Sequence, residues 1–155
     1  HLVQLNRKDY NAPNLKRIFL DNKCLKIFHF ARFDVTVLRH YLNVNCQPIF
    51  CTKIASKLTR TYTDKHGLKD LCKELLNIDL SKKEQTSDWS VEELSKEQLE
   101  YAASDVLYLH ELKGQLEEKL KKLDRFNLAQ DCFNFIKTRA YLDLNGWPDI
   151  DIFEH

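Results

Sequence analysis

Glycine and proline are scarce in this sequence, with three of each among 155 residues. Tight hairpins depend on these residues for their turns, so their scarcity argues against many short antiparallel strands and favours a helix-rich fold. No apolar run approaches the roughly 18 residues that a membrane-spanning helix requires. The first residues, His-Leu-Val-Gln-Leu, also lack the basic start and apolar core of a signal peptide. These absences predict no membrane span, and the cytoplasm is the default compartment.

The five cysteines include no Cys-x-x-Cys pair, and their number is odd. A disulfide framework or a structural zinc site is therefore not expected. Most of the cysteines stand inside apolar runs, so we expect small buried thiols in a reducing compartment.

A strong excess of charge is also missing, because the net charge is only +1. Global charge therefore does not indicate a nucleic-acid partner. Six basic residues nevertheless cluster between Lys53 and Lys73 against two acidic ones. Such a cluster can attract phosphate, although a solvated helix face has the same pattern.

Short β-leaning runs alternate with helical periodicity in the first half of the chain. The strand candidates are residues 1–5, 24–30 and 49–51, and helices are expected over 15–20, over 32–42, from Ile54 and from Gly67. The second half is helical, with a helix continuing from Ser95 to Leu120 and a last one over 125–142. With no linker or repeat, residues 1–155 are predicted to form a single α/β domain with a partly parallel sheet.

A capping box fixes the start of the helix that holds the most informative pair of residues. In Ser95-Lys96-Glu97-Gln98, serine and glutamine can satisfy each other's backbone donors at a helix start. Tyr101 and Asp105 follow, four residues apart, which places a phenol and a carboxylate on one helix face. Such a pair alone is usually solvated or makes an ordinary hydrogen bond.

Asp34 follows a predicted strand, at the end where ligands collect in parallel α/β sheets. A carboxylate in this position can instead cap the next helix. If Asp34 and Asp105 shared divalent cations, and Tyr101 held a water beside them, the three side chains would suit metal-assisted phosphodiester hydrolysis.

Residues 29–38, His-Phe-Ala-Arg-Phe-Asp-Val-Thr-Val-Leu, resemble the second exonuclease motif of the ribonuclease D family. Thr86-Ser87-Asp88-Trp89 and the later Leu-Glu-Tyr-Ala-Ala-Ser-Asp around Tyr101 resemble that family's third motif and its lead-in. The resemblance covers roughly residues 24–112. It implies a DnaQ-like, ribonuclease H-like exonuclease fold, with a central mixed sheet flanked by helices and a helical C-terminal half.

The resemblance implies a 3′–5′ exoribonuclease of the tyrosine-containing four-carboxylate type, which releases nucleoside 5′-monophosphates. Asp34 and Asp105 would bind two Mg²⁺ or Mn²⁺ ions, and Tyr101 would orient the attacking water. The partner would be a single-stranded 3′ end of RNA, or of DNA. Side chains expected to contact nucleic acid are His29, Arg32, Phe33, Lys82, Gln85 and Trp89. Core packing is the alternative for Phe33 and Trp89, and a satisfied strand-end histidine is the alternative for His29.

The sequence departs from the family pattern in its first motif, because no Asp-x-Glu precedes the second motif. We expect this motif upstream of His1, and a further omitted segment that would show as a chain break near Asn6. If the chain lacks the motif, the fragment alone is predicted to be inactive. The tail over residues 139–148 resembles the ending of short bacterial forms, which carry no extra helical nucleic-acid-binding domain.

Two alternatives remain at this point. A 3′–5′ DNA exonuclease of the proofreading type shares these motifs, since discrimination depends on contacts to the 2′-hydroxyl. A non-catalytic nucleic-acid-binding module would retain the fold without the first motif. The oligomeric state does not follow from the sequence.

Overall fold

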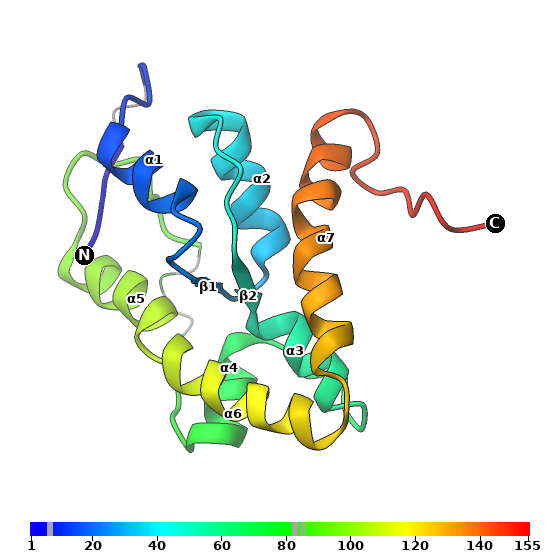
Figure 1. Cartoon of the computed structure of the whole chain (residues 1–155). Helices are drawn as coiled ribbons and strands as arrows, with labels where there is room; N and C mark the ends of the chain where they lie inside the picture. The colour runs from blue at the N-terminus through cyan, green and yellow to red at the C-terminus, as the bar shows by residue number, and fades with distance from the viewer. Residues whose placement is uncertain (6–7, 82–83, 85) are drawn as a thin grey trace.

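A computed structural model describes residues 1–5, 8–81, 84 and 86–155. Helices dominate, as the scarcity of glycine and proline predicts (Figure 1). In chain order the elements are α1 (Pro13–Leu20), β1 (Lys26–Phe28), α2 (Ala31–Leu42), β2 (Ile49–Cys51), α3 (Thr52–Thr59), α4 (Leu68–Leu71), the π-helical turn η1 (Cys72–Leu76), α5 (Lys96–Leu107), α6 (Leu109–Lys122) and α7 (Phe126–Leu144). Within this described part, no helix is long and apolar enough to cross a membrane.

The β1–α2–β2 segment is the unit on which the site is built. The two strands are parallel and pair in register, with Ile27 opposite Phe50. A parallel pair requires a crossover, and α2 supplies it. Because β2 is fully buried while β1 is only partly so, the pair lies in the interior. The α/β class is confirmed, and the sheet of the described residues consists of this parallel pair.

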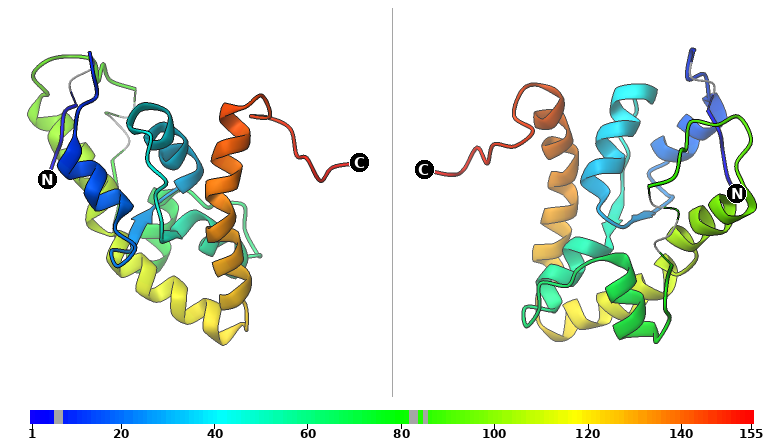
Figure 2. Two further views of the ribbon diagram at one scale, coloured as in Figure 1. Left: turned by 45° about the horizontal axis from the view of Figure 1, so that its top comes forward. Right: turned by 180° about the vertical axis from the view of Figure 1, so that it is seen from behind.

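The helix α7 packs along α2, and the two lie side by side in every view (Figures 1 and 2). Their shared core includes Val35 of α2 and Phe133 of α7, which are almost inaccessible to solvent. The ring of Phe133 lies 4.8 Å from that of Phe50 in β2, measured between centroids. Leu112 and Leu116 of α6 belong to the same core, so the second half of the chain covers the βα unit.

The capping box at the start of α5 forms as predicted. The Ser95 hydroxyl accepts a hydrogen bond from the Gln98 backbone, and the Gln98 side chain accepts one from the Ser95 backbone. Gln98 is buried, and its amide also donates to Ser87 Oγ at 3.1 Å and to the Asp88 carbonyl at 2.9 Å. One side chain therefore starts the helix and holds the preceding segment against it. The expected single helix to Leu120 is wrong, because the chain turns at Tyr108 between α5 and α6.

Two other sequence-based predictions are wrong. Residues 1–5 form no strand. The Gln4 side chain instead donates hydrogen bonds to the backbone carbonyls of Val91 and Glu92. Cys24 is exposed rather than buried, although Cys46, Cys51 and Cys72 are buried as expected. The predicted chain break near Asn6 lies outside the described residues.

One member of the basic cluster, Arg60, is a buried structural residue. Its side chain is 1% exposed and forms a two-pronged ion pair with Glu74, including a 3.0 Å bond from Nε. Its Nη1 also donates to Ser56 Oγ at 2.9 Å. Tyr62 donates to the same carboxylate at 2.5 Å. For Arg60, the prediction of a solvated or phosphate-binding side chain is therefore wrong.

Replacing Glu74 with glutamine is expected to lower the free energy of unfolding by about 1 kcal/mol at neutral pH. Hydrogen bonds from Arg60 and then Tyr62 lower the pKa of Glu74 to about 2. The stabilisation is therefore complete above the ordinary glutamate pKa of about 4.3 and is lost as the pH falls towards 2. Urea titrations at several pH values should show the two proteins converging over that interval. Asp79→Asn, in the exposed pair with Lys73, is the control expected to have almost no effect.

Candidate active site

A pocket of about 680 Å³ opens at the carboxyl end of β1. It brings together Asp34 from α2 with Tyr101 and Asp105 from α5, although about seventy residues separate the two helices. His29 and Phe33 line the same pocket. Five of the nine residues predicted to act in the site therefore share one cavity.

Asp34 lies in the first turn of α2, directly after β1. The helix-capping alternative is wrong, because Phe30 occupies the N-cap position and Asp34 stands one turn further on. Burial raises the pKa of Asp34 to about 6. The carboxylate is thus partly desolvated, and a positive charge beside it would be stabilising.

Asp105 and Tyr101 lie one turn apart on α5, as the spacing predicts. Burial raises the pKa of Asp105. The pKa of Tyr101 is also raised, first by burial and then by the negative charge of Asp105. The phenol therefore keeps its proton at neutral pH and can act as a hydrogen-bond donor.

The two carboxylates have the chemistry of a divalent-cation site. Carboxylate oxygens are the ligands that Mg²⁺ and Mn²⁺ prefer, and neutralising two desolvated acids would offset the penalty that raises both pKa values. In the part of the chain that the structure describes, no group of three or more histidine, cysteine, aspartate or glutamate side chains is arranged for a metal. The described residues thus bring two carboxylates, Asp34 and Asp105, to the pocket.

His29 is held by a short relay of hydrogen bonds at the end of β1. Thr52 Oγ1 donates its single proton to the Phe28 carbonyl at 3.2 Å, so His29 Nδ1, 3.0 Å from Oγ1, acts as the donor to it. Burial, followed by the charge of Lys53, lowers the pKa of His29 to about 4. The imidazole is therefore neutral at pH 7, with its free lone pair on Nε2.

The two aromatic candidates occupy different surroundings. Phe33 is 63% exposed, so the core-packing alternative is wrong for it and its ring is open to a ligand. Trp89 is half-buried, lies 6.0 Å from the Tyr101 ring between centroids, and lines a neighbouring hollow with Gln4 and Tyr10.

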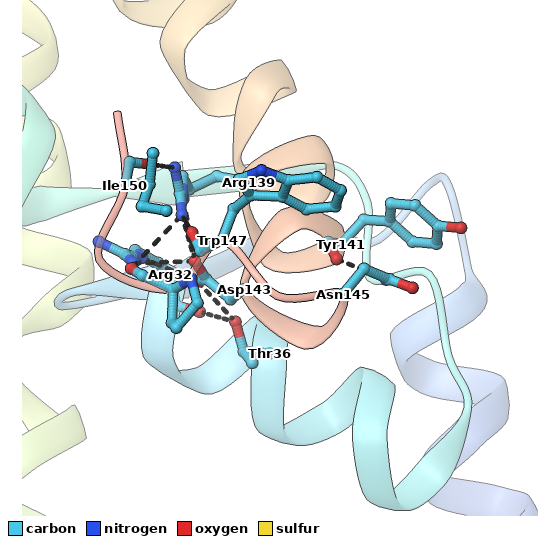
Figure 3. A network of polar contacts seen from close by, with 9 residues as sticks. Arg32, Thr36, Arg139, Tyr141, Asp143, Asn145, Trp147 and Ile150 are labelled. Carbon is cyan, nitrogen blue, oxygen red and sulfur yellow. Dashed lines mark hydrogen bonds and ion pairs between the residues drawn. The ribbon is translucent and has the colours of Figure 1, made fainter. Parts of the chain in front are cut away.

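Arg32 is not among the residues that line the pocket. Its guanidinium forms two 2.8 Å bonds with Asp143 of α7 and also donates to the Pro148 carbonyl (Figure 3). Arg139 binds the same carboxylate, at 2.7 and 2.9 Å. Arg32 is thus placed where it joins α2 to α7. The other two candidates, Lys82 and Gln85, lie outside the described residues.

Among the lining residues that were not predicted as site residues, Lys53, Lys69 and Phe30 bear on the chemistry of the pocket. Lys53 and Lys69 bring positive charge to the pocket. In the sequence both belong to the basic cluster between Lys53 and Lys73, a pattern that a solvated helix face also produces. Phe30 was part of the recognised motif but was given no role. Its backbone is left-handed, with φ of 69°, and the Lys53 ammonium lies 4.1 Å from the centre of its ring. A non-glycine residue in this conformation is strained, and such strain collects at functional sites.

Comparisons with known proteins identify the family to which the chain is similar. A family model described as a 3′–5′ exonuclease matches residues 1–121. The ribonuclease D of Xanthomonas oryzae is 32% identical over 139 residues, which cover 89% of this chain and 38% of that protein. The chain thus spans about two fifths of the length of this curated relative and about a third of the ribonuclease D of Bartonella henselae.

Solved structures with the same fold include two of higher identity. NrnC of Brucella melitensis bound to pGG is 58% identical, with a TM-score of 0.90, covering 94% of this chain and 70% of that one. The same protein with bound Mg²⁺ has a TM-score of 0.89 at 56% identity, with the same coverage. Escherichia coli ribonuclease D, an exoribonuclease involved in structured RNA processing, has a TM-score of 0.76 at 25% identity, covering 87% of this chain and 36% of that one. The fold expected from the sequence motifs is confirmed.

Proposed function

The chain belongs to the family of 3′–5′ exonuclease domains, and we propose that it hydrolyses RNA from the 3′ end and releases nucleoside 5′-monophosphates. One observation carries the proposal: a single pocket holds Asp34, Tyr101 and Asp105. The two acids come from separate sequence motifs, and the fold brings them to one cavity. The ribonuclease D relatives and the NrnC structure bound to pGG support RNA as the substrate class.

Divalent metal is the cofactor of this family, and the NrnC structure with Mg²⁺ supports the same cofactor here. Asp34 and Asp105 would hold the metal in this chain, and we propose two ions, Mg²⁺ or Mn²⁺. Further carboxylates would come from the Asp-x-Glu motif expected upstream of His1. When bound, the ions would lower the pKa of a water and stabilise the leaving 3′ oxygen.

The other side chains of the pocket would position the RNA end and the water. Tyr101, protonated at neutral pH, donates a hydrogen bond that orients the attacking water. The exposed ring of Phe33 offers a stacking surface for a terminal base. Lys53 and Lys69 supply positive charge for the phosphates. Neutral His29 offers a hydrogen-bond acceptor without adding a further charge.

Digestion of a 5′-labelled RNA oligonucleotide by the full-length natural protein tests the proposal. With Mn²⁺ present, we expect a ladder that shortens stepwise from the 3′ end, faster than for the matching DNA. A chelator should stop the reaction. Equal or faster cutting of DNA would instead identify a DNA exonuclease, and retained RNA binding without cleavage would identify a binding module.

A further inference from the structure

The junction between β2 and α3 holds the end of β1 through a set of side-chain contacts. Thr52, the first residue of α3, is fully buried. Its hydroxyl lies 3.2 Å from the Phe28 carbonyl and 3.0 Å from Nδ1 of His29. The next residue, Lys53, places its ammonium 4.1 Å from the centre of the Phe30 ring. Two adjacent residues of α3 thus contact three consecutive residues, at the point where the chain leaves β1 and enters α2.

The direction of one hydroxyl proton decides which nitrogen of His29 is protonated. A carbonyl can only accept, so Thr52 donates its proton to Phe28 and meets His29 with a lone pair. Nδ1 therefore carries a proton. Because burial keeps the imidazole neutral at pH 7, Nε2 carries none and is a hydrogen-bond acceptor. In the part of the chain that the structure describes, the bond through Nδ1 is the one hydrogen bond of this ring.

The side of the ring opposite Nδ1 belongs to the catalytic pocket. His29 lines that pocket, whereas Thr52 is fully buried and is not among the lining residues. With Nδ1 turned to the buried threonine, the remaining edge, which includes Nε2, is the one available to a ligand. A neutral acceptor repels the lone pairs of phosphate oxygens and favours a hydroxyl or an amine. The pocket thus offers a partner for a neutral donor, beside its charged groups.

Given the proposed exoribonuclease function, we propose that Thr52 is a positioning residue for sugar recognition: by keeping the proton of His29 on Nδ1, it presents Nε2 to the 2′-hydroxyl of the terminal ribose. The donors on the four bases differ, whereas every ribonucleotide has this hydroxyl and DNA lacks it. An acceptor in a site that releases nucleotides one after another is therefore matched to the sugar. Such a site discriminates against the analogue without the hydroxyl, because its acceptor is then left unpaired.

Binding of adenosine 5′-monophosphate and of its 2′-deoxy analogue to the full natural protein tests the proposal without cleavage. In calorimetry with Mn²⁺ present, the ribonucleotide is expected to bind about tenfold more tightly. Thr52→Val should bring the two affinities together, and Thr52→Ser, which keeps a hydroxyl, should preserve the difference. Thr59→Val is the matched control, since Thr59 is buried in the same helix, donates to the Ala55 carbonyl and does not line the pocket.

Equal affinity for the two nucleotides in the natural protein, or a ratio that Thr52→Val leaves unchanged, would overturn the proposal. So would weaker Mn²⁺ binding by Thr52→Val, because His29 would then be a metal ligand. The proposed hydrolysis is tested separately: an uncut RNA together with a ratio that responds to Thr52 would contradict the hydrolysis and retain the sugar contact.

The ring ¹⁵N chemical shifts of His29 provide a second readout, because protonated and unprotonated ring nitrogens resonate far apart. The spectrum of His29→Gln identifies the signals by their absence. We expect the proton on Nδ1 in the natural protein and in Thr52→Ser. In Thr52→Val, part of the population should move to the Nε2-protonated form, because Nδ1 has lost its acceptor. A natural protein with the proton on Nε2 would contradict the role of Thr52.

Discussion

Asp105→Asn is expected to lower the rate of RNA hydrolysis by at least about 10³-fold, because a neutral amide cannot replace a carboxylate that holds a divalent cation. The fold should tolerate the change. Since burial raises the pKa of Asp105, its charge is a cost to the folded protein, and the nearly isosteric amide removes that cost. The thermal midpoint of the variant should therefore equal or exceed that of the natural protein.

Initial rates on 5′-labelled RNA, thermal melts and Mn²⁺ titrations would be measured together for this variant. Weaker Mn²⁺ binding should accompany the lost rate. Glu100→Gln on the same helix is the matched control, because Glu100 is exposed and faces Lys96 across one turn. It should retain full activity. A fully active, stable Asp105→Asn protein would contradict the assignment of Asp105 to the metal.

Tyr101→Phe is expected to lower the turnover number about 10²-fold while leaving Mn²⁺ binding and the Michaelis constant nearly unchanged. The substitution removes the hydroxyl that would orient the water and keeps the ring that faces Trp89. Because the pKa of Tyr101 is raised, the natural protein should lose no activity through this group as the pH rises through neutrality.

Single-turnover rates at saturating Mn²⁺, taken from pH 6 to pH 9, would measure this effect. Tyr141→Phe serves as the control, since Tyr141 is half exposed on α7, outside the catalytic pocket. An effect confined to a higher Michaelis constant, with the turnover number unchanged, would mean that Tyr101 binds the RNA rather than the water.

Local sequence signals predicted most of the elements and the helix that carries Tyr101 and Asp105. The Ser95 capping box placed the start of α5 correctly, because its two hydrogen bonds join residues three apart. The same helix spacing put Tyr101 and Asp105 on one face. The strand over residues 49–51 was also correct, since its apolar residues are buried on both sides. Each of these sequence signals lies within a few consecutive residues of the chain.

The features that the sequence did not predict depend on distant partners. Arg32 was expected at a phosphate, but its carboxylate partner, Asp143, lies 111 residues further along. In the sequence, Arg60 resembles its exposed basic neighbours. Its ion pair with Glu74 holds it in the interior. Residues 1–5 have the composition of a strand, yet a strand forms only where another strand offers its backbone groups. No pattern within a short window contains this information.

The two helices that supply the carboxylates of the catalytic pocket, α2 and α5, differ in how many side chains they bury. Asp34 stands on α2, which buries Ala31, Val35 and Leu42, whereas α5, described at every residue, buries only Gln98. Helices with few buried side chains open by local unfolding at a lower free energy than the rest of a protein. A ligand that binds across both helices, a metal ion between Asp34 and Asp105 above all, would selectively stabilise the closed form. Cation binding and the ordering of α5 would then be thermodynamically linked.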